Sequence, residues 1–154
     1  VGSEMCIRDR DHLKLTIDAM HLPPGDVTAL LASLRYRLEP RLKACGVELQ
    51  WEVGLIDPVR RLDAQAMRHL QFMVFEAFSN VLQHAHASRL RIEANPTQNW
   101  VRLRIVDDGC GFDPLRPGGK GLASLRDRAR AIGASLQIDS QPGQTVVDIV
   151  IPAD

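Results

Sequence analysis

The sequence predicts an α+β fold of two layers, in which a five-stranded mixed sheet carries three helices on one face. Four segments alternate apolar and polar residues, wholly or nearly, and a fifth is more continuously apolar, which is typical of strands. Three others repeat apolar residues at steps of three and four, as amphipathic helices do. The order helix, strand, helix, two strands, helix, two strands argues against a doubly wound nucleotide-binding fold, which needs strict alternation and a sheet covered on both faces.

Each predicted helix lies next to a capping or terminating residue. The expected spans are 27–45, 63 to about 86, and about 122–132. Asp26 and Asp63 can accept hydrogen bonds from the first backbone N–H groups of the first two helices. Gly46 and Gly133 follow the first and third, where glycine commonly ends a helix.

The strands are predicted at 47–53, 89–94, 101–106, 135–139 and 145–151. The last of these is the most continuously apolar, as a central strand would be. Asn95–Asn99 is expected to be a tight connection, and Pro142-Gly143 to turn the last two strands into a hairpin. Between the two pairs lies a segment rich in proline and glycine, Asp113–Gly121, which is expected to be a flexible loop.

Length and charge are those of one ordinary domain. The 154 residues contain 19 basic and 19 acidic side chains, so no net charge points to nucleic acid as a partner. The domain is expected at 27–152, after a non-native or junction segment at 1–10 and, at 11–26, the tail of a preceding helical region with its linker. No apolar run reaches the roughly 18 residues of a membrane span, so no membrane contact is expected of this segment.

The three cysteines are odd in number and widely spaced. They contain no C-x-x-C pair, so neither a disulfide framework nor a zinc site is predicted. A cytoplasmic location fits this cysteine usage best, although the parent protein could still be anchored in a membrane elsewhere.

Three polar side chains recur every fourth residue on the second helix. Glu76, Asn80 and His84 would therefore form one stripe along its surface. A carboxylate, an amide and an imidazole on one line can polarise water, coordinate a hard cation through oxygen and meet a phosphate. A solvated helix face explains the same pattern.

The segment after the third strand, Val106–Phe112, reads VDDGCGF. It could be an acidic metal-binding turn, a reactive thiol in a glycine bend, a loop that lets a flat ligand approach the backbone, or simply a tight turn. Further along, Gly118, Gly119 and Gly121 surround Lys120 before a helix, a recurrent phosphate-binding arrangement. Ordinary loop flexibility accounts for these glycines equally well.

Taken in order, these motifs resemble the ATP-binding domain of sensor histidine kinases. The matching residues are Glu76, Asn80, His84, Asp107, Gly109, Gly111, Phe112, Gly119, Gly121, Leu122, Gly143 and Thr145. The likeness covers about residues 27–152 and is closest to the subgroup that pairs with helix-turn-helix response regulators. It implies a Bergerat-type fold, a superfamily that includes gyrase and the ninety-kilodalton heat-shock chaperones, with ATP and Mg²⁺ as ligands.

The resemblance also implies a role for each motif. Glu76 would be the general base or would orient the acceptor imidazole, and Asn80 would hold Mg²⁺ through its side-chain oxygen. Asp107 would accept a hydrogen bond from the adenine amino group, and Thr145 would be a second polar contact beside it. The other expected nucleotide-binding residues are His84 near the phosphates, Gly109 and Gly111 against the ring, and Gly119, Lys120, Gly121 and Leu122 at the edge of a mobile lid.

The implied reaction is transfer of the ATP γ-phosphoryl group to a histidine on a dimerisation domain absent from this sequence. The implied partners are a response regulator and a second copy of the parent protein. Gln83 stands where the subgroup usually has a basic residue, which keeps open an ATP-binding module without productive transfer. A serine-phosphorylating relative of the anti-sigma type is a further alternative. Arg126, Arg128 and Arg130 fit a solvated helix face or a surface that meets the regulator.

Overall fold

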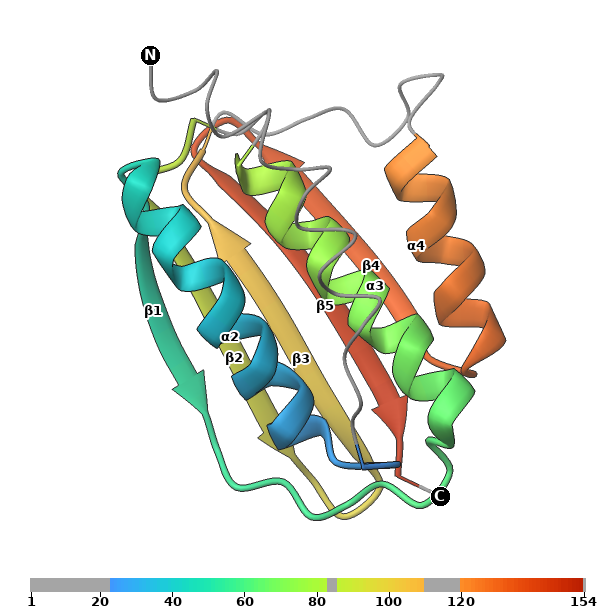
Figure 1. Cartoon of the computed structure of the whole chain (residues 1–154). Coiled ribbons are helices and arrows are strands. Elements are labelled where there is room, and N and C mark those ends of the chain that lie inside the picture. The colour runs from blue at the N-terminus through green and yellow to red at the C-terminus, as the bar shows by residue number, and fades with distance from the viewer. Residues whose placement is uncertain (1–22, 83–85, 110–119, 154) are drawn as a thin grey trace.

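A computed structural model describes residues 23–82, 86–109 and 120–153 of the chain. It confirms the two-layer α+β architecture: three helices cover one face of a five-stranded sheet (Figure 1). The strand order is β1-β2-β3-β5-β4. The β1–β2 pair is parallel and the other three pairs are antiparallel, so the sheet is mixed.

Helix α2, Val27–Ala44, buries the apolar face that its periodicity predicts. The Asp26 side chain accepts a hydrogen bond from the backbone N–H of Ala29, at 2.9 Å, and so caps the helix as expected. Gly46 follows with φ +76°, a left-handed conformation that suits glycine. The first helix was therefore predicted almost to the residue.

Helix α3, Ala64–Asn80, starts where predicted, because Asp63 accepts from the N–H of Ala66 at 2.8 Å. Its predicted end near His86 is wrong. The last helical turn widens at residues 81–82, and His86 has φ +49°, outside the helical range. The physical reason is topological, since the chain must leave the helix and reverse before β2 begins at Arg89.

Helix α4, Lys120–Ala131, begins two residues before its predicted start at Leu122. Lys120 and Gly121 therefore belong to a helical backbone instead of the preceding loop. Gly133, with φ +68°, terminates the helix region as expected.

The five strands occupy the predicted segments; β1 begins one residue later than predicted, and the other four have slightly wider bounds. They are β1 Glu48–Val53, β2 Arg89–Pro96, β3 Trp100–Asp107, β4 Ser135–Gln141 and β5 Gln144–Pro152. The predicted connection at 95–99 is shorter than expected, because pairing between β2 and β3 continues to Pro96 and Val101. Gly143 turns the β4–β5 hairpin with φ +92°.

The core lies between the helices and the inner face of the sheet. Inner-face residues of three adjacent strands are almost wholly buried: Leu90, Ile92, Ala94, Val101, Leu103, Ile105, Val147, Ile149 and Ile151. Phe75 and Phe78 of α3 pack into the same cluster and are each 1% exposed. Burial of this apolar surface is the main force that fixes the helices on one face.

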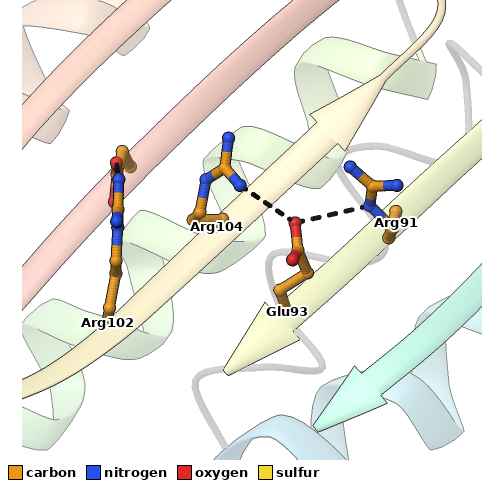
Figure 2. A network of polar contacts seen from close by, with 5 residues as sticks. Arg91, Glu93, Arg102 and Arg104 are labelled. Carbon is orange, nitrogen blue, oxygen red and sulfur yellow. Dashed lines mark hydrogen bonds and ion pairs between the residues drawn. The ribbon is translucent and has the colours of Figure 1, made fainter. Parts of the chain in front are cut away.

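The outer face of the sheet is charged. Glu93 on β2 lies 3.4 Å from Arg91 on its own strand and 3.4 Å from Arg104 on β3 (Figure 2). Arg102 on β3 donates from Nε to both carboxylate oxygens of Asp148 on β5, at 3.0 and 3.1 Å. This hydrogen bond and the charge of Asp148 raise the pKa of Arg102. Glu93 and Arg104 are direct partners in the β2–β3 register, whereas Arg102 lies diagonally across from Asp148, which is opposite Arg104.

Two expectations about environment can be compared with the structure. Cys45 is disulfide-bonded, contrary to the prediction from cysteine spacing, and its partner lies outside the described residues. Within the described part of the chain, no helix combines the length and apolar character needed to cross a membrane.

Candidate functional site

The last residue of β3, Asp107, is a buried carboxylate, only 7% exposed. Its Oδ1 accepts a hydrogen bond from the backbone N–H of Gly109 at 2.9 Å. No other described residue makes a hydrogen bond to this side chain, so Oδ2 can accept from a ligand. Burial raises the pKa of Asp107, and the neighbouring charge of Asp108 adds to the rise, while the bond from Gly109 opposes it.

Thr145 lies beside Asp107 on the adjacent strand. The two residues are direct partners in the β3–β5 register, and Thr145 is 2% exposed. Its hydroxyl is 2.9 Å from that of Ser140 on β4. The N–H of Gly143 in the β4–β5 turn donates to the carbonyl of Gly109 at 2.8 Å. The hairpin therefore holds Gly109 in place next to Asp107.

The polar stripe on α3 lies at the same end of the molecule. Figure 1 shows that α3 and β3 finish, and α4 and β5 begin, at one end of the sandwich. Glu76 and Asn80 lie in the last turns of α3 and are half-buried. The fold thus brings the predicted residues of α3, β3 and β5 to one end, although they are far apart in the sequence.

Other predicted site residues cannot be placed as side chains. His84, Gly111 and Gly119 lie outside the described residues, and Lys120, Gly121 and Leu122 are described only as the first turn of α4. Within the described ranges, no cluster of three or more histidine, cysteine, aspartate or glutamate residues could bind a metal ion. A cation at this site would need ligands of another type, such as the Asn80 amide oxygen.

Asp108 makes contacts that the sequence did not reveal. Its Oδ1 accepts from the backbone N–H groups of Ser88 and Arg89, at 2.8 and 2.9 Å, and its Oδ2 accepts from the Ser88 hydroxyl at 2.6 Å. Desolvation acts to raise the pKa of Asp108, but these hydrogen bonds outweigh it and lower the pKa. No role for Asp108 was predicted from the sequence, because an aspartate in a turn carries no sign of a partner twenty positions away.

Arg128 does not lie on a purely solvated face of α4. Its guanidinium stacks 4.4 Å from the centre of the Phe72 ring on α3. Its Nε donates to the Ser124 hydroxyl at 3.2 Å, and its Nη1 lies 3.2 Å from Nδ1 of His69. Arg126 and Arg130 are exposed, as the solvated-face interpretation predicts. Of the three arginines, Arg128 therefore packs α4 against α3, and the other two lie on the surface.

Comparison with known proteins gives a consistent assignment. Residues 66–154 match the family model described as "Histidine kinase-, DNA gyrase B-, and HSP90-like ATPase". The sensor histidine kinase LiaS of Bacillus subtilis (strain 168) is 28% identical over 145 residues, which span 92% of this chain and 37% of that protein. The sensor histidine kinase MctS of Rhizobium johnstonii is 30% identical over 132 residues, 82% of this chain and 27% of that protein. The chain thus spans little more than a third of these relatives at most.

Solved structures of low sequence identity share the fold. The histidine kinase AdeS of Acinetobacter baumannii superimposes with a TM-score of 0.71 at 19% identity, over 97% of this chain and 76% of that one. Full-length ShkA in complex with AMPPNP gives a TM-score of 0.69 at 19% identity, over 97% of this chain and 36% of that one.

Proposed function

Because this chain belongs to the histidine kinase-, DNA gyrase B- and HSP90-like ATPase family, we propose that it binds Mg-ATP and donates the γ-phosphoryl group to a histidine of its parent protein. The chain is an ATP-binding catalytic domain of the sensor histidine kinase type. The acceptor histidine would lie on a dimerisation domain outside this sequence, and the downstream partner would be a response regulator. The parent would act as a homodimer, with or without a membrane anchor.

One observation carries the nucleotide part of the proposal, namely the buried carboxylate of Asp107. Oδ1 is held by Gly109, and Oδ2 has no hydrogen bond from the described residues. Burial of this residue, which is 7% exposed, disfavours the charge of the carboxylate, so a further hydrogen bond from a ligand would stabilise it. The exocyclic amino group of adenine is such a donor, and the hydroxyl of Thr145 on the neighbouring strand offers a second polar contact.

The phosphate end of the nucleotide would meet the end of α3. Asn80 would hold Mg²⁺ through its amide oxygen, and the bound cation would neutralise charge on the phosphate oxygens. Glu76 would act as a general base that accepts the proton of the acceptor imidazole, or it would orient that imidazole. The bond between the γ-phosphorus and its bridging oxygen breaks as the imidazole nitrogen attacks, and ADP leaves. Such a reaction asks the protein chiefly for positioning and charge compensation.

The proposal is tested in two steps with the purified chain. Titration calorimetry with Mg²⁺ should show ATP and ADP binding, and the absence of binding at millimolar nucleotide would refute the proposal. The chain is then mixed with γ-labelled ATP and a dimeric histidine-bearing hairpin from a relative. Acid-labile phosphohistidine should form with the native hairpin and not with one whose histidine is replaced by alanine.

A matched variant separates binding from transfer. Glu76→Gln keeps the size of the side chain and removes its charge, so it should retain nucleotide affinity and lose phosphohistidine formation. ATP binding without transfer by the unaltered chain would favour the module without productive transfer. Acid-stable phosphoserine on a protein partner would favour the serine-phosphorylating alternative. LiaS, MctS and AdeS, which are all histidine kinases, favour neither alternative.

A further inference from the structure

We propose that Asp108 is a positioning residue for nucleotide recognition: it fastens the start of β2 to the end of β3 and thereby fixes the direction in which Asp107 presents its carboxylate. The inference rests on the proposed function, because it assumes that Asp107 receives adenine. It assigns a role to a residue that is not among the motif residues identified from the sequence.

The contact consists of four hydrogen bonds around one carboxylate and its peptide group. The Asp108 side chain accepts from Ser88 twice and from Arg89 once, at 2.6 to 2.9 Å. In the opposite direction, the backbone N–H of Asp108 donates to the carbonyl of Arg89 at 3.3 Å. Hydrogen bonds to a charged acceptor are stronger than neutral ones, so this is a firm attachment even at an exposed position.

The attachment continues the sheet at the point where its backbone ladder ends. The β2–β3 register stops with Leu90 opposite Asp107. Beyond that pair the N–H groups of Ser88 and Arg89 have a side chain, Asp108, as their acceptor. Ser88 is also held from the other side, because its carbonyl accepts from the N–H of Glu48 at 2.8 Å. Strand ends fray when their last groups lack partners, and this contact prevents fraying directly next to Asp107.

The same contact anchors the segment that follows α3. His86, two residues before Ser88, has φ +49°, which residues other than glycine adopt only when the surroundings hold them there. Asn80 lies at the other end of this short connection, at the end of α3. Fastening Ser88 to Asp108 therefore ties the segment after the expected metal-binding residue to the turn expected to receive adenine.

A second effect of Asp108 is electrostatic. The pKa of Asp108 is lowered, so its carboxylate is ionised at neutral pH, and this charge contributes to the raised pKa of Asp107 after burial. A role in backbone stability alone would not change the protonation of Asp107. The pH dependence of nucleotide binding thus reports this electrostatic effect separately from folding, whereas the preference for the adenine amino group reports the positioning role.

The test compares three variants of the chain. Asp108→Ala removes all three side-chain hydrogen bonds, and Ser88→Ala removes one of them. Asp108→Asn removes the charge, but its side-chain oxygen can still accept from both N–H groups and its amide can donate to the Ser88 hydroxyl. Asp139→Ala, at an exposed position of β4, is the matched control. Each variant is titrated with Mg-ADP and with Mg-IDP, in which the amino group of adenine is replaced by a carbonyl.

Asp108→Ala should weaken ADP binding by about tenfold, equivalent to one lost hydrogen bond in the site, and should lower the preference for ADP over IDP. Ser88→Ala should show a smaller change in the same direction, and Asp139→Ala none. Asp108→Asn should keep ADP affinity near neutral pH but lose it at a lower pH than the unaltered chain does. Comparing the two proteins at each pH cancels the titration of the ligand itself.

The outcomes separate this inference from the proposed function. If the unaltered chain does not bind ADP, the proposed function fails, and the positioning role fails with it. If it binds ADP and the adenine preference is unchanged in both Asp108→Ala and Ser88→Ala, only the positioning role is overturned. If Asp108→Ala does not fold, Ser88→Ala decides the question, and an unchanged preference of that variant for ADP over IDP overturns the positioning role.

Discussion

Asp107 and Thr145 are direct partners across β3 and β5, and both are almost completely buried although both are polar. The Thr145 hydroxyl is satisfied by Ser140, whereas the carboxylate of Asp107 receives one bond, from Gly109, among the described residues. A sheet that places a carboxylate at such a point sacrifices stability for a binding group. The predictions below follow from this arrangement and from the contacts that support it.

Asp107→Asn should weaken ADP binding by about 1.5–3 kcal/mol, because a charge-assisted hydrogen bond to adenine is lost. Calorimetry in the presence of Mg²⁺ measures the change. Asp139→Asn, an exposed carboxylate of the same sheet, is the control and should bind as the unaltered chain does. Equal affinities of the two variants would contradict the adenine assignment.

The same substitution should stabilise the nucleotide-free domain. The pKa of Asp107 is raised in the folded protein above the reference value of 3.8, so folding favours the protonated form. Its contribution is fully present below pH 3.8 and is lost as the pH rises through the raised folded value. The free energy of unfolding of Asp107→Asn should therefore exceed that of the unaltered chain increasingly over this window. Urea titrations at a series of pH values measure it, and a constant difference would contradict the expected linkage.

Asn80→Ala should abolish most of the gain in nucleotide affinity that Mg²⁺ provides, because the amide oxygen expected to hold the cation is removed. Affinities for ADP are measured with Mg²⁺ and with chelator. The variant and the unaltered chain should bind alike in chelator and differ by about tenfold with Mg²⁺. Gln65→Ala, exposed near the other end of α3, is the control, and an unchanged response of Asn80→Ala to Mg²⁺ would exclude the metal role.

Arg128→Ala should destabilise the domain by about 1–2 kcal/mol, since the guanidinium loses its stacking on Phe72 and its contacts with Ser124 and His69. Arg130→Ala, on the exposed side of the same helix, should change stability by less than about 0.5 kcal/mol. Urea unfolding of both variants measures the contrast. Similar values for the two would mean that Arg128 does not dock α4 on α3.

Two glycines with nearly the same backbone angle should respond differently to alanine. Gly25 and Gly46 have φ of +81° and +76°, so each substitution costs about 1–2 kcal/mol in conformational energy. A Cβ at Gly25 would lie 2.6 Å from the carbonyl oxygen of Val59, whereas nothing lies within 4 Å of one at Gly46. Gly25→Ala should therefore cost at least ~1 kcal/mol more than Gly46→Ala in chemical unfolding. Equal losses of stability in the two variants would show that the backbone around Val59 moves to accommodate the added Cβ.

The arrangement of helices and strands was largely predictable because its signals are local. Alternation identified four strands and a more continuously apolar run the fifth, and the caps Asp26 and Asp63 identified the starts of α2 and α3. The end of α3 was predicted too late in the sequence, and so was the start of α4. The end of α3 depends on where the chain must turn to reach β2, and the residue types that follow Asn80 carry no information about that turn.

The candidate site divides in the same way. The residue types and spacing of Glu76, Asn80 and Asp107 were sufficient to select an ATP-binding family, because that chemistry needs particular side chains in a particular order. The placement of Arg128 on Phe72 was not foreseen, since an arginine on a helix pattern looks the same whether it faces solvent or a neighbouring helix.

The sequence by itself determined the two-layer fold, the capped helices and the aspartate at the end of β3, because periodicity and side-chain chemistry are written along the chain. Only the tertiary structure decided that Asp108 holds Ser88 and Arg89. Two of the groups that Asp108 accepts from are backbone N–H groups, which every residue except proline possesses. A partner of that kind leaves no trace in the sequence, and only the fold can bring it to the carboxylate.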